Sequence, residues 1–90
     1  MTHLKPQYQD VVSKVSELSQ IHLARLAHVP SGAPVSRSFL MQDDFFYGLE
    51  FRLGAFRAVW LIGSDVIEVF GGDQPLDLIY LPADSARRAA

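Results

Sequence analysis

The chain has 90 residues, of which 49% are hydrophobic and 20% are charged, and its formal net charge is −2. That length fits one domain, and the composition excludes the class of disordered chains with low hydrophobicity and high charge. The sequence contains no cysteine, which excludes disulfides and thiolate metal sites, and the slightly negative charge disfavours nonspecific binding to nucleic acid or to an anionic membrane.

The N-terminal sequence MTHLKPQYQD lacks the apolar core of a signal peptide. The longest apolar segment, residues 45–62, is interrupted by Glu50, Arg52 and Arg57 and has the two-residue period of strands rather than the pattern of a membrane helix. We therefore expect no membrane association and a cytoplasmic protein, which the absence of cysteine allows.

Residues 5–28 are predicted to form one amphipathic helix. At 100° per residue the apolar side chains gather on a single broad stripe, and most polar side chains lie elsewhere. Pro6 suits the first helical turn, and the PSGAP segment at residues 30–34 ends the helix. The stripe consists of Tyr8, Val11, Val12, Val15, Leu18, Leu23 and Leu26.

After Pro34 the sequence changes to short apolar segments that are separated by turn residues. These segments predict strands at residues 35–41, 45–53, 56–62, 66–70 and 76–81. Connections this short join antiparallel neighbours, so the expected fold class is α+β. We expect a single domain, residues 1–90, with the N-terminal helix packed on one face of a four- to five-stranded antiparallel meander sheet. The tail, residues 83–90, is expected to fray or to form a short helical turn.

A two-residue hairpin loop at Gly54-Ala55 sets the register of the two central strands. Every resulting cross-strand pair is apolar or aromatic: Leu53 with Phe56, Phe51 with Ala58, Leu49 with Trp60, and Tyr47 with Ile62. A two-residue turn at Ser64-Asp65 would continue the same face through Ile67 and Val69. This face is predicted to be the core beneath the helix.

The opposite face of the sheet is predicted to expose apolar side chains, although the uncovered side of an antiparallel sheet is usually polar. One helix cannot cover both sides, and such a patch is expected to exceed the few hundred Å² that soluble monomers usually expose. We therefore predict a small noncatalytic interaction module that forms a homodimer through this face. Alternatively, the C-terminal segment, a ligand or a different protein covers this face. With a two-residue turn at Asp43-Asp44, the interface residues are Phe39, Met41, Phe46, Val59, Leu61 and Phe70.

Charged side chains on the same face suggest a second function. In this register Arg52 lies opposite Arg57 at the hairpin end, where two like charges need an anion between them. We therefore consider binding of a small anionic or aromatic ligand. Single-stranded nucleic-acid binders also interleave arginines with aromatic residues, but the glutamates make this face nearly neutral. The candidate ligand-binding residues are Arg37, which is expected opposite Glu50, together with Glu50, Arg52 and Arg57.

No set of catalytic or metal-binding residues can be assembled from the spacing. His22 lies near the centre of the apolar stripe, but a base or metal ligand there would need a partner, and a histidine bonded at the edge of the core is the commoner case. Asp43 and Asp44 are interpreted as turn residues, and the glycines match no phosphate-binding pattern. We therefore expect no cofactor and no metal site, and an enzyme is only the third hypothesis.

Overall fold

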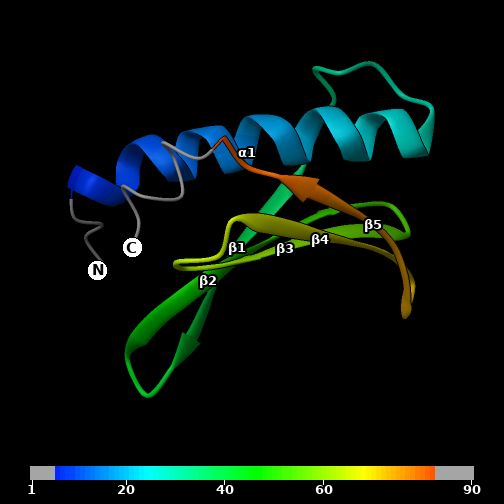
Figure 1. Cartoon of the computed structure of the whole chain (residues 1–90). Coiled ribbons are helices and arrows are strands. Elements are labelled where there is room, and N and C mark those ends of the chain that lie inside the picture. Colours follow the sequence, from blue (N-terminus) through cyan, green and yellow to red (C-terminus); the bar gives the residue numbers. More distant parts are fainter. Residues whose placement is uncertain (1–5, 83–90) are drawn as a thin grey trace.

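The computed structural model describes residues 6–82. Its one helix, α1 (Pro6–Ala27), packs against one face of a five-stranded antiparallel sheet with the strand order β1-β2-β3-β4-β5 (Figure 1). The strands are β1 (Ser36–Gln42), β2 (Phe45–Leu53), β3 (Phe56–Leu61), β4 (Val66–Gly71) and β5 (Gln74–Tyr80). The predicted α+β meander is therefore confirmed, whereas the predicted tail lies outside the described residues.

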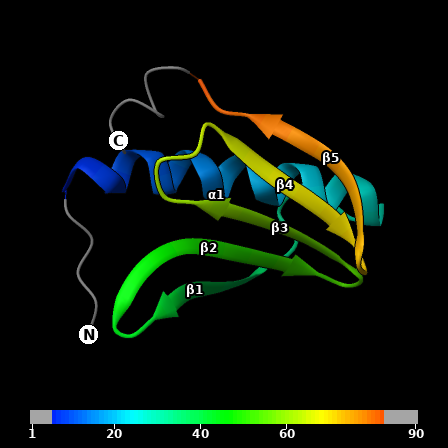
Figure 2. The same ribbon diagram turned by 60° about the horizontal axis from the view of Figure 1, so that its bottom comes forward.

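The core fills the space between α1 and the sheet, and Figure 2 shows α1 behind one face only. Burial of each large apolar side chain contributes roughly 1.5–3 kcal/mol, so this layer accounts for most of the favourable packing energy. The indole of Trp60 is fully buried, and its Nε1 donates a hydrogen bond to the Ser64 carbonyl at 3.0 Å. The buried apolar residues are Val11, Val12, Val15, Leu23, Ala24, Leu49, Phe51, Ala58, Trp60, Ile67, Val69 and Leu81.

Two of the predicted hairpin turns are present as expected. Gly54 begins the β2–β3 turn with φ of 61°, which suits glycine, and Leu53 pairs with Phe56. Asp43 and Asp44 form the β1–β2 turn with φ of 51° and 70°, in the left-handed region that aspartate tolerates better than most residues. The β2–β3 register is confirmed through Phe51 with Ala58 and Leu49 with Trp60.

The predicted register between β1 and β2 is wrong beyond the turn. Met41 pairs with Phe46 but Leu40 pairs with Gly48, so Tyr47 is an extra residue in β2 and forms a β-bulge. Because side chains alternate along a strand, a one-residue shift moves the rest of β1 to the opposite side of the sheet.

The bulge corrects the predicted positions of several site residues. Arg37 pairs with Phe51 rather than with Glu50, and Phe39 pairs with the buried Leu49. Phe46 packs against the core and makes an edge-to-face contact with Phe39, with ring centroids 5.3 Å apart. Phe39, Met41, Phe46 and Arg37 therefore lie on the helix side of the sheet, not on the opposite side.

Two further strand details differ from the prediction. Trp60, rather than Ile62, pairs with Ile67, because the β3–β4 connection is two residues longer than expected. A two-residue shift preserves the side of the sheet, so Ile67 and Val69 are in the core as predicted. β5 begins earlier than predicted because the turn after Gly71 is tight and Gly71 pairs directly with Gln74.

Candidate interaction face

We call the side of the sheet turned away from α1 the open face. The cross-strand register assigns its members: Glu50 pairs with Val59, Val59 with Glu68, and Glu68 with Leu78. Leu61, Leu78 and Tyr80 expose 44%, 46% and 69% of their surface. The apolar members of the open face are Leu40, Val59, Leu61, Val66, Phe70, Pro75, Leu78 and Tyr80.

Half of the predicted interface residues lie on this face. Val59, Leu61 and Phe70 are on the open face, but Phe39, Met41 and Phe46 are not, because of the bulge. Leu78 and Tyr80 of β5 were missed by the sequence analysis. Residues 76–81 are apolar on both sides of the strand apart from Asp77, so only the register could show which side chains are outward.

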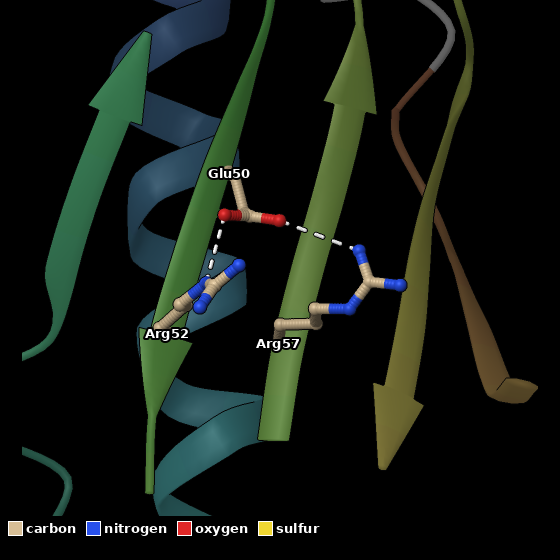
Figure 3. A network of polar contacts seen from close by, with 3 residues as sticks. All are labelled: Glu50, Arg52 and Arg57. Carbon is tan, nitrogen blue, oxygen red and sulfur yellow. Dashed lines mark hydrogen bonds and ion pairs between the residues drawn. The ribbon is translucent and has the colours of Figure 1, made fainter. Parts of the chain in front are cut away.

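Glu50 supplies the anion between the two arginines (Figure 3). Arg52 Nε donates to Glu50 Oε1 at 2.8 Å, and Arg57 Nη1 donates to Glu50 Oε2 at 3.3 Å. The Arg57 guanidinium also lies 4.3 Å from the centre of the Phe70 ring, within the range of a cation–π contact. Only 14% of the Glu50 side chain is exposed. This network therefore compensates the like charges that the sequence places opposite each other.

A Glu50→Gln variant is expected to lower the free energy of unfolding by about 1 kcal/mol, because it removes the charge that separates Arg52 from Arg57. The loss is moderate because both arginines remain partly exposed. Urea denaturation measures it, and Arg52→Gln in the same chain should recover part of the loss. Unchanged stability in the single variant would contradict a structural role for the network.

The two edges of the sheet are poorly suited to pairing with another strand. The β1–β2 pair contains the bulge at Tyr47, and the β4–β5 pair contains a second irregularity that skips Leu76. Pro75 removes a backbone donor from edge strand β5. Such features are typical of edges that resist strand addition, so the open face is better suited to contact than the edges.

The open face is hollowed at the β4–β5 side. A hollow of about 510 Å³ is lined by Glu68, Val69, Pro75, Leu76, Asp77, Leu78 and Tyr80. Four of these residues belong to the open face, so the hollow continues its apolar surface and can receive side chains from a partner.

His22 lies at the edge of the core. Its Nε2 is 3.3 Å from Asp77 Oδ2 without making a hydrogen bond, and the Ser19 hydroxyl is buried without a partner. The sequence places His22 at the edge of the core but does not identify Asp77 of β5 as its neighbour. Because Ser19 is fully buried and not bonded to His22, these three residues do not form an activated nucleophile.

Other kinds of site find no support among residues 6–82. No three histidine, cysteine, aspartate or glutamate side chains of this part of the chain gather where a metal ion could bind. None of its helices is both long and apolar enough to span a membrane. Comparison with family models, curated proteins and solved structures finds no match to this chain.

Proposed function

We propose that the protein is a small noncatalytic interaction module that self-associates through the open face. The observation that supports this most directly is the exposure of Leu61, Leu78 and Tyr80 on a face that no described segment covers. The interface residues in this proposal are Val59, Leu61, Phe70, Leu78 and Tyr80. Face-to-face packing of two sheets about 10 Å apart would remove these side chains from water.

The charges of the open face favour a second copy as the partner. Its charged residues are Glu50, Arg52, Arg57 and Glu68, two of each sign, so the formal charges cancel. A face without net charge can pack against the same face of a second copy without net electrostatic repulsion. Glu68 has no ion pair within the described residues, and only Nε of Arg52 is bonded, so these groups are available for ion pairs across the interface.

Sedimentation velocity over a range of micromolar concentrations tests this proposal. We expect the sedimentation coefficient to rise with concentration from that of a 10.0 kDa monomer to that of a dimer. A monomer at every concentration would contradict self-association.

Binding of a small anion at the Arg52/Arg57 hairpin end is the second candidate. A hollow of about 210 Å³ lies there and is lined by Arg52, Gly54, Ala55, Phe56, Arg57, Gly72 and Asp73. Glu50 already pairs with both arginines, and Asp73 adds a second carboxylate, so this site is less suited to an anion than the open face is to a dimer. Stabilisation by an anion in a thermal-shift assay, lost in Arg52→Ala, would favour the second candidate.

A further inference from the structure

Arg37 occupies a different environment from the other two arginines of the sheet. The bulge in β2 moves it to the helix side, where it pairs with Phe51. Its guanidinium has no carboxylate partner within the described residues, and it lies 5.5 Å from the centroid of the Phe39 ring. This distance is within the range of a cation–π contact, but the hydrogen-bond donors of Arg37 are not used by the described residues.

A small pocket lies beside Arg37, between α1 and the first two strands. Its volume is about 210 Å³, and its lining residues are Ser16, Gln20, Val35, Arg37 and Phe51. None of the five is acidic, in contrast to the hollow at Arg52 and Arg57, which includes Asp73.

Ser16 also lines the pocket, and it carries a second unused donor that rotation of its side chain would turn toward a ligand. The Ser16 hydroxyl is buried and has no hydrogen-bond partner. Burial of an unpaired hydroxyl is unfavourable, so a ligand that accepts a hydrogen bond from it would recover part of this cost. Gln20 Nε2 donates to the Ser31 carbonyl at 3.0 Å and to the Ala33 carbonyl at 3.4 Å, and so holds the α1–β1 connection next to the pocket.

We propose that this pocket binds a small monocarboxylate with a short apolar or aromatic body. A guanidinium offers two parallel donors that match the two oxygens of a carboxylate, and Ser16 supplies a further donor once its side chain rotates into the pocket. Val35 and Phe51 provide apolar contact for the body of the ligand. The pocket is smaller than the roughly 300–1,000 Å³ of sites for drug-sized ligands, which restricts the ligand to a few heavy atoms.

This site is independent of the proposed dimer. Arg37 and Phe51 lie on the helix side of the sheet, whereas self-association uses the open face. Failure of one proposal therefore leaves the other intact.

Titration of the ¹⁵N-labelled full-length chain with butyrate and with benzoate, followed by NMR, tests the proposal. We expect saturable shifts of the Arg37 Nε–H and of the amides around Ser16 and Gln20. Arg37→Gln should raise the dissociation constant at least about tenfold, the effect of losing a charge-assisted hydrogen bond. Ser16→Ala should also weaken binding, yet raise the melting temperature of the ligand-free protein because it removes an unpaired buried hydroxyl.

Arg25→Gln is the matched control. Arg25 is an exposed arginine in the last turn of α1 and does not line the pocket, so its loss changes the net charge equally and should leave the affinity unchanged. Absence of saturable shifts with either carboxylate would overturn the proposal. Equal weakening by Arg25→Gln and Arg37→Gln would show only nonspecific attraction, and tighter binding of inorganic phosphate than of both carboxylates would show that the ligand class is wrong.

Discussion

A Leu61→Glu variant is expected to sediment as a monomer at concentrations where the wild-type protein is a dimer, with the dimer dissociation constant raised at least about 100-fold. Leu61 lies on β3, the central strand of the sheet, and is 44% exposed on the open face. A two-fold axis places the substitution in the interface twice, and each carboxylate would be removed from water without a partner. Because Leu61 is partly exposed in the single chain, the fold of the monomer should survive.

Ile21→Glu is the matched control for this variant. Ile21 is 38% exposed, but it lies on α1, on the other side of the molecule from the open face. This control introduces the same charge and should leave the dimer intact. Circular dichroism of both variants should match that of the wild type. If Leu61→Glu remains a dimer, the open face is not the contact, and the exposed apolar residues of the β1–β2 hairpin would become the next surface to test.

The fold could be predicted from the sequence because its strongest signals are local. The 3.6-residue pattern of the helix and the Gly54-Ala55 turn each determine a neighbouring stretch of chain, and the four apolar pairs around that turn reinforce one register. The β3–β4 connection is longer than predicted, but the predicted core residues remain correct. A shift of two residues leaves Ile67 on the same side of the sheet.

The candidate face could be predicted only in part, because a one-residue bulge reverses a strand. Phe45, Phe46 and Tyr47 are three consecutive aromatic residues and do not alternate with polar ones, so the sequence contains no pattern that identifies the extra residue. The bulge places Phe46 against the core and leaves Tyr47 43% exposed, the reverse of the prediction.

The Arg37 pocket depends on the same bulge. In the predicted register Arg37 would be neutralised by Glu50 and would lie on the open face, away from α1. Ser16 and Gln20 of α1 line the same pocket as Arg37, and no local sequence signal shows that these distant segments lie together.

Replacement of Gly48 by alanine is expected to lower the free energy of unfolding by about 2 kcal/mol. Gly48 directly follows the extra residue of the bulge and pairs with Leu40 on one side and Leu61 on the other. A Cβ at Gly48 would collide with the carbonyl oxygen of Trp60 and would lie 3.2 Å from Cα of Leu61. Backbone atoms cannot rotate away as a flexible side chain can, so β2 and β3 would have to separate locally. The midpoint of urea denaturation measures the loss.

Gly32→Ala separates this clash from the general effect of replacing a glycine. No atom lies within 4 Å of the position of a Cβ at Gly32, and its backbone is outside the left-handed region, so alanine should stabilise by about 0.4–1 kcal/mol through the unfolded chain. The two substitutions should therefore have opposite signs. If Gly48→Ala does not change the stability, the backbone of β2 can relax at the bulge. The bulge would then not be rigid enough to fix the side of the sheet on which Arg37 lies. A clear loss would mean that the close approach of β2 and β3 at Gly48 is needed for stability. That approach positions the apolar surface around Leu61, and it supports the strand pair that carries Arg37.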